Sequence, residues 1–232
     1  MYRKFTYKPW LIALVSLVPF VLASGHAEAG SAKKPDYTTM SAEELAEYLI
    51  FEAKGYDIAA KTQEGGTVGD RLKQDELQKT CSKLKGESVD GETAEKVTEM
   101  AAKSIVYPKG GITLGDWKKG QALVQNAFGF RVGKKTDDHS KRETGGMCMN
   151  CHQLEKSMVD RSGTVGPSLI EYGKTLGMSE ETKKHTYKSI YNPHAIFPCT
   201  NMPRFGVNGI LTQEKIADIM AYLLDPESPV NK

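Results

Sequence analysis

Cys148-Met149-Asn150-Cys151-His152 is the stretch of this 232-residue sequence that decides its fold. Two thiols three positions apart can each add to a vinyl group of haem, and the adjacent histidine then reaches the iron. A redox C-x-x-C normally lies in a βαβ pattern, and a structural zinc site needs a second ligand pair; the sequence shows neither. The motif therefore predicts one haem c, attached covalently to Cys148 and Cys151, with His152 as an iron ligand.

The first 29 residues have the pattern of a cleaved export signal. A basic start is followed by an uncharged apolar stretch over 10–23 and by Ala27-Glu28-Ala29, which fits a small-x-small cleavage site. An uncleaved membrane anchor is the alternative, but this stretch is shorter than the ~20 apolar residues that a spanning helix needs. No later segment is long and apolar enough to span. We expect a periplasmic mature chain that begins near Gly30, with no stable membrane anchor.

Charge gives no indication of a nucleic-acid partner. Residues 1–29 hold three of the 31 basic and one of the 29 acidic residues, so the rest of the chain has 28 of each. The formal charge of +2 therefore belongs to the export signal. A neutral chain with interspersed charges lacks the basic face that nucleic acid attracts.

Helical spacing of apolar residues dominates after the export signal, and strand-like alternation is scarce, so we predict an all-α fold. Residues 30–110 are expected to form a helical N-terminal region. It should contain one helix after a capping box at Ser41, one opened by Asp70 and carrying Cys81, and one over 93–106. No residue of this region has a catalytic pattern.

Residues 111–232 are predicted to form the haem domain. Asp116 should cap a helix that runs to about Ala127. Further helices are expected over 151–159, 167–176 and 179–191, and a last one from about Thr212 to Asp225, with apolar residues at helical spacing.

Iron bound by His152 needs a sixth ligand or an open position. Met202 is the leading candidate, because the proline at 203 keeps this loop out of helix and lets the thioether point sideways. His/Met ligation recurs in cytochromes c. His194, which follows a proline in a similar loop, is the main alternative, and His185 is another.

The order of a haem motif, a Gly-Pro loop, a methionine loop and a terminal helix over about 114–224 resembles class I cytochromes c. In that family the proline of the Gly-Pro pair accepts a hydrogen bond from the iron-bound histidine. The resemblance therefore implies that Pro167 of Gly166-Pro167 orients His152. The family also packs a small residue of its first helix against an aromatic residue of its last, and Gly120 and Tyr222 match these positions.

Five runs give a more specific resemblance. They are Leu114-Gly115-Asp116-Trp117-Lys118-Lys119-Gly120, Cys151-His152-Gln153-Leu154, Gly163-Thr164-Val165-Gly166-Pro167-Ser168-Leu169, Cys199-Thr200-Asn201-Met202-Pro203-Arg204-Phe205-Gly206, and Leu211-Thr212 with Ala221-Tyr222-Leu223-Leu224-Asp225-Pro226-Glu227-Ser228-Pro229-Val230-Asn231. Together they resemble the SoxX family, the monohaem cytochrome subunits of thiosulfate-oxidising SoxAX complexes, over about 105–231.

The resemblance to SoxX implies that this chain is the electron-transfer subunit of a heteromeric enzyme of the L-cysteine S-thiosulfotransferase type. Its partner, a SoxA-type cytochrome, couples thiosulfate oxidatively to a carrier-protein cysteine and releases two electrons. This chain would accept electrons at its haem and pass them to a downstream cytochrome, without being catalytic in isolation. Two other functions stay open: a free-standing mobile electron carrier, and a haem sensor with an open sixth position.

Two cysteines, Cys81 and Cys199, lie outside the haem motif. An even leftover pair in an exported chain predicts a disulfide, which would tie the N-terminal region to the methionine loop. Two buried free thiols, or a thiol kept for a partner or metal, are the alternatives.

Overall fold

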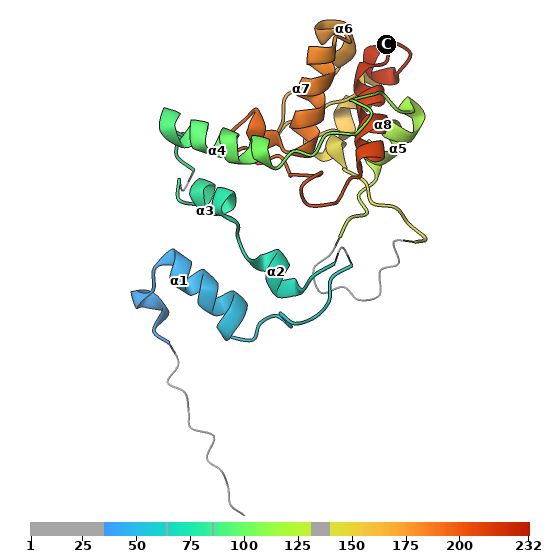
Figure 1. Ribbon diagram of the computed structural model, residues 1–232. Coiled ribbons are helices and arrows are strands. Elements are labelled where there is room, and N and C mark those ends of the chain that lie inside the picture. Colours follow the sequence, from blue (N-terminus) through green and yellow to red (C-terminus); the bar gives the residue numbers. More distant parts are fainter. Residues whose placement is uncertain (1–34, 64, 85, 131–139) are drawn as a thin grey trace, which may run out of the picture. The chain divides into compact units, whose positions relative to one another are not determined.

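The computed structural model describes residues 35–63, 65–84, 86–130 and 140–232 (Figure 1). The described residues are helical and contain no strand, only an isolated antiparallel bridge between Lys61 and Thr67. The predicted all-α fold is confirmed. None of the described helices is long and apolar enough to cross a membrane. The predicted export signal at residues 1–29 lies outside the described residues.

The α-helices are α1 (Ala42–Glu47), α2 (Val68–Leu72), α3 (Glu76–Ser82), α4 (Gly91–Lys103), α5 (Trp117–Gln125), α6 (Tyr172–Leu176), α7 (Glu180–Tyr191) and α8 (Gln213–Leu224). Short 3₁₀ segments are η1 (Tyr37–Thr39), η3 (Cys148–Asn150), η4 (Lys156–Arg161), η5 (Pro193–Ala195) and η6 (Pro229–Asn231), and η2 (Tyr48–Glu52) is a π-helix. The described residues from Ser41 to Lys232 form one compact unit, separate from residues 35–40. The predicted domain boundary at 110/111 lies within this range and stays a prediction.

The N-terminal helices follow their caps. Ser41 and Glu44 form the predicted capping box of α1. The expectation that Asp70 opens one long helix is wrong, because the chain forms two short helices there. Thr67 caps α2 with Asp70 as its reciprocal partner at the third position, and Asp75 caps α3. Side chains that satisfy free backbone N–H groups start a helix wherever they fit, so the second cap divides the segment.

The helices predicted from Asp116, Ser179 and Thr212 are present, and each of these side chains accepts a hydrogen bond from the first turn of its helix. The helix expected over 151–159 is wrong: the chain forms η3 and η4 instead. The helix expected from Pro167 begins only at Tyr172. Carbonyls of 149–153 accept hydrogen bonds from backbone N–H groups of 163–169, so neither group is left for a helix.

The core of the second half of the chain is the contact between α5 and α8. The predicted stripe of α8 is buried, with Ile216, Ile219 and Met220 no more than 1% exposed. Gly120 of α5 lies directly on α8. A Cβ at this position would overlap the Asp218 carbonyl and lie 2.8 Å from the Tyr222 Cβ. The close crossing therefore requires glycine.

We expect Gly120→Ala to destabilise the fold, because the added methyl group forces α5 away from α8. The cost should be about 1–3 kcal/mol, as for other overpacked sites. Gly91→Ala is the matched control, since a Cβ there meets nothing within 4 Å and alanine favours helix by up to about 1 kcal/mol. Urea unfolding of both variants measures the difference. Equal stability of the two would contradict the close crossing.

Candidate cofactor site around His152

The C-x-x-C-H segment is a single tight turn. Met147 has a left-handed backbone (φ 44°, ψ 44°), and η3 then carries Cys148 to Asn150. In a 3₁₀-helix, side chains three positions apart lie on the same side. Cys148 and Cys151 have this spacing, are both free thiols and are both partly buried. The local backbone thus presents the two thiols together, with His152 next in the chain.

A second loop, residues 163–169, lies along this segment. Three backbone N–H groups of the loop donate hydrogen bonds of 2.7–2.8 Å to carbonyls of 149–153: Gly163 to Met149, Gly166 to Cys151, and Leu169 to Gln153. These three hydrogen bonds fix the register between two segments that contain no α-helix at this point. The next contact, to the imidazole, depends on that register.

The Pro167 carbonyl lies 2.7 Å from Nδ1 of His152. A carbonyl only accepts, so Nδ1 must carry the hydrogen and Nε2 of the neutral ring keeps its lone pair. Nε2 has no hydrogen-bond partner among the described residues. Gly166 lies against the ring, and a Cβ there would overlap Cε1. A hydrogen bond from one ring nitrogen to a backbone carbonyl is a common way of orienting a metal-binding histidine.

The environment of Cys148 differs from that of the reactive thiol in a redox C-x-x-C. Burial, with a smaller effect of neighbouring Cys151, raises the pKa of the Cys148 thiol to about 12. Redox and nucleophilic cysteines have lowered pKa values, because the thiolate is the reactive form. The alternative of a zinc site is weakened as well, since Cys81 and Cys199 are bonded to each other and unavailable as thiolate ligands. Two free thiols, of which Cys148 packs against the hydrophobic core, beside an oriented imidazole fit a covalently held haem.

Glu155, three residues after His152, is a buried carboxylate that the sequence did not single out. It is 7% exposed and accepts hydrogen bonds from Tyr222 Oη (2.6 Å), Gln121 Nε2 (2.7 Å) and Ser157 Oγ (3.2 Å). Burial and this carboxylate raise the pKa of Tyr222. The network joins α5 and α8 to the chain that follows the histidine. Tyr222 is the one residue of this network that the sequence indicated, as the partner of Gly120 and not of Glu155.

The loop that carries Met202, residues 199–206 and called the methionine loop, approaches the same region. A Cβ added to Gly146 would lie 3.1 Å from Cys148 Sγ and 3.8 Å from Phe205 Cε1. Phe205, which follows Met202 by three residues, therefore lies close to the thiol segment. Met202 is partly buried and belongs to the hydrophobic core that also contains Cys148 and Phe205. Phe205 of the same loop is therefore near Cys148, while the ligand role of Met202 stays a prediction.

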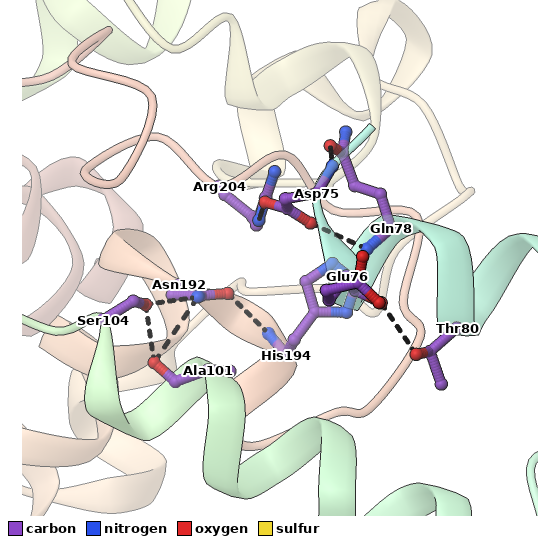
Figure 2. Close-up of polar contacts among 9 residues, drawn as sticks. All are labelled: Asp75, Glu76, Gln78, Thr80, Ala101, Ser104, Asn192, His194 and Arg204. Carbon is purple, nitrogen blue, oxygen red and sulfur yellow. Dashed lines mark hydrogen bonds and ion pairs between the residues drawn. The ribbon is translucent and has the colours of Figure 1, made fainter. Parts of the chain in front are cut away.

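The two competing histidines lie on and after α7. His185 is partly buried and its ring meets Phe197 edge-on. His194, in η5, is 8% exposed, and its Nδ1 has no hydrogen-bond partner in the described part of the chain. Figure 2 shows its ring extending toward the first turn of α3, beside Asp75 and Arg204. His139 lies outside the described residues.

Cys81 of α3 and Cys199 of the methionine loop form a disulfide, with their Cα atoms 5.3 Å apart. The structure thus contains the bond predicted for the two leftover cysteines. It closes a sequence separation of 118 residues and joins the N-terminal helices to the methionine loop.

No family model matches the chain. An uncharacterized lipoprotein of Aquifex aeolicus (strain VF5) is 44% identical over 164 residues, which cover 68% of this chain and 73% of that protein. The chain therefore belongs to the same family as this lipoprotein.

We expect His194 to make stability depend on pH. Burial and the Arg204 charge lower its pKa, and Asp75 opposes them in part. The folded-state pKa is below the unfolded value of about 6.5, so the unfolded chain binds the proton first as pH falls. The stabilisation is therefore complete above pH ~6.5 and decreases as pH falls toward the folded-state pKa.

His194→Gln should flatten the dependence of the unfolding free energy on pH between about 7 and 5. Urea unfolding at a series of pH values measures it. A variant whose curve keeps the wild-type slope would show that another group is responsible.

Proposed function

We propose that this chain is a c-type cytochrome with one haem c, attached through Cys148 and Cys151 and bound by His152. The observation that carries the proposal is the hydrogen bond between His152 Nδ1 and the Pro167 carbonyl. It leaves the Nε2 lone pair for a metal, beside two free thiols on one side of a 3₁₀ turn. The haem, when bound, supplies reversible one-electron chemistry.

Met202 is the proposed sixth ligand. Phe205 of its loop lies close to Gly146, beside Cys148, and Met202 itself packs against the hydrophobic core. A thioether favours ferrous iron and raises the reduction potential, which suits an electron acceptor. With the contact of Gly120 and Tyr222 between α5 and α8, these features support a class I cytochrome c-like haem domain over about 111–232.

The proposed reaction partner is a SoxA-type cytochrome. In the proposed complex, thiosulfate is coupled to a carrier-protein cysteine on the partner, and two electrons leave through this chain to a downstream cytochrome. The sequence runs shared with SoxX support this assignment, and their residues include the methionine loop and the C-terminal tail. Ser228 and Asn231 of that tail are no more than 1% exposed and bind the end of α8, so the tail is part of the folded domain.

The proposed location is the periplasm. The residues before position 30 have the pattern of an export signal, and the description of the Aquifex aeolicus relative as a lipoprotein agrees with an exported family. Haem attachment to cysteine thiols also suits an exported chain.

Met202→Ala tests the ligation. The variant should keep its covalent haem but lose the weak charge-transfer band near the red end of the oxidised spectrum. It should also have a lower reduction potential, because the thioether no longer favours ferrous iron. Met178→Ala, at a 46% exposed methionine, is the control and should leave the band in place. A band that survives in Met202→Ala would direct attention to His194 or His185.

Capture of the tagged protein from the periplasm tests the partner. We expect one co-purifying chain with its own C-x-x-C-H motif, identified by mass spectrometry, and a pyridine haemochrome spectrum typical of haem c in this chain. A haem-bearing monomer without a partner would support the mobile carrier instead. Rapid carbon monoxide binding to the reduced protein would support a sensor with an open sixth position.

A further inference from the structure

The segment around Met202 has little backbone support of its own. Thr200 N donates to Phe197 O, Met202 N donates to Thr200 Oγ1 at 3.3 Å, and Phe205 N donates to Pro203 O. Among the described residues, the backbone of 200–203 makes no hydrogen bond outside 197–205. The chain is next held by its backbone at Gly206, whose N–H donates to Tyr191 O at the end of α7 at 3.1 Å. A segment without ladder bonds to a helix or strand opens easily. Between Cys199 and Gly206, the position of Met202 must therefore depend on side chains.

Two side chains of this loop bind the N-terminal helices, one on each side of Met202. Three residues before it, Cys199 is bonded to Cys81 of α3. Two residues after it, Arg204 Nη1 lies 2.7 Å from Asp75 Oδ2. The loop is thus held at both ends by one short helix that is more than 100 residues away in the sequence.

The pair of Arg204 and Asp75 is asymmetric in its exposure. The Arg204 side chain is 10% exposed, whereas that of Asp75 is 50% exposed. A buried guanidinium without its carboxylate loses most of its compensation for desolvation, so the pair matters more to the loop than an exposed ion pair would. Burial raises the pKa of Asp75, but the Gln78 N–H and the Arg204 guanidinium outweigh it and hold the pKa below its usual value.

Asp75 uses its two oxygens for different tasks. Oδ1 accepts from Gln78 N at 2.8 Å and caps α3, while Oδ2 accepts from Arg204. Figure 2 shows this division, with Arg204 and Asp75 facing each other above His194. The start of α3 is therefore coupled directly to the methionine loop.

The helix α3 is in turn held by the rest of the chain. It packs on α4, and α4 packs on η5 just before the methionine loop. Asn192, which is fully buried, donates from Nδ2 to Ser104 Oγ at 2.8 Å and to Ala101 O at 3.5 Å. The N-terminal helices are thus fixed to the chain on the approach to the loop as well as to the loop itself.

We propose that α3 is a brace for the sixth ligand: Asp75, through Arg204, and the Cys81–Cys199 disulfide are positioning groups that keep Met202 presented to the haem iron. This inference rests on the proposed function, in which Met202 is that ligand. It gives residues 75–104 a role that a minimal electron carrier would not need. Loss of either anchor should let the loop open and admit an external ligand.

The test uses the full-length haem protein and imidazole, which competes with the thioether for the sixth position. Asp75→Asn is the sharpest variant, because asparagine caps a helix as well as aspartate does and keeps the bond to Gln78, while the charge facing Arg204 is lost. We expect imidazole to bind the oxidised variant about fivefold more tightly. The double variant Cys81→Ser/Cys199→Ser should show about a tenfold increase.

Glu99→Gln is the matched control. Glu99 pairs with Lys103 at 2.7 Å within α4 and does not reach the loop, so imidazole affinity should stay at the wild-type value. The red charge-transfer band is recorded for each variant together with the far-ultraviolet circular dichroism, which checks that the helices remain folded.

The outcomes separate the two proposals. If Met202→Ala abolishes the band while Asp75→Asn and the double cysteine variant bind imidazole as the wild type does, the brace is wrong and the ligand assignment stands. If Met202→Ala leaves the band in place, the ligand assignment fails, and with it the premise of the brace. Increased imidazole affinity in both brace variants, with an unchanged Glu99→Gln, supports the inference.

Discussion

The hydrogen bond from His152 Nδ1 to the Pro167 carbonyl is the contact on which the site depends. It exists because the loop 163–169 is bonded along 149–153 in one register, and because Gly166 lets that loop lie against the imidazole. A shift of one residue would bring a different carbonyl, or none, to the ring. The tautomer of His152, and hence the nitrogen that is free for a metal, therefore follows from the pairing of two loops.

Buried polar groups connect the parts of the chain that surround this contact. Glu155, three residues after His152, accepts hydrogen bonds from Gln121 of α5 and Tyr222 of α8. Asn192, seven residues before the methionine loop, donates to Ser104 at the end of α4. Arg204 joins the loop to α3. A buried polar group is costly unless its partners are in place, so each of them favours one arrangement over others of similar apolar burial. They specify geometry around a site where the backbone is largely irregular.

Local sequence was sufficient to predict where four of the helices begin. The starts of α1, α5, α7 and α8 follow from Ser41, Asp116, Ser179 and Thr212. Prediction failed after Asp70, where Asp75 provides a second cap, and over 151–159, where the loop at 163–169 takes the backbone hydrogen bonds. The second failure could not be avoided by reading neighbours in the chain, because the competing donors are ten or more residues away.

The sequence by itself determined the all-α class and the pairing of the two remaining cysteines, Cys81 and Cys199, while haem attachment to Cys148 and Cys151 stays a prediction. These follow from residue type and short spacing. Only the tertiary structure decided that Glu155 is buried under Tyr222, and that Asp75 reaches Arg204 across a separation of 129 residues. Such contacts depend on how helices pack, since the free energy of burying a polar group is set by partners that no local pattern reveals.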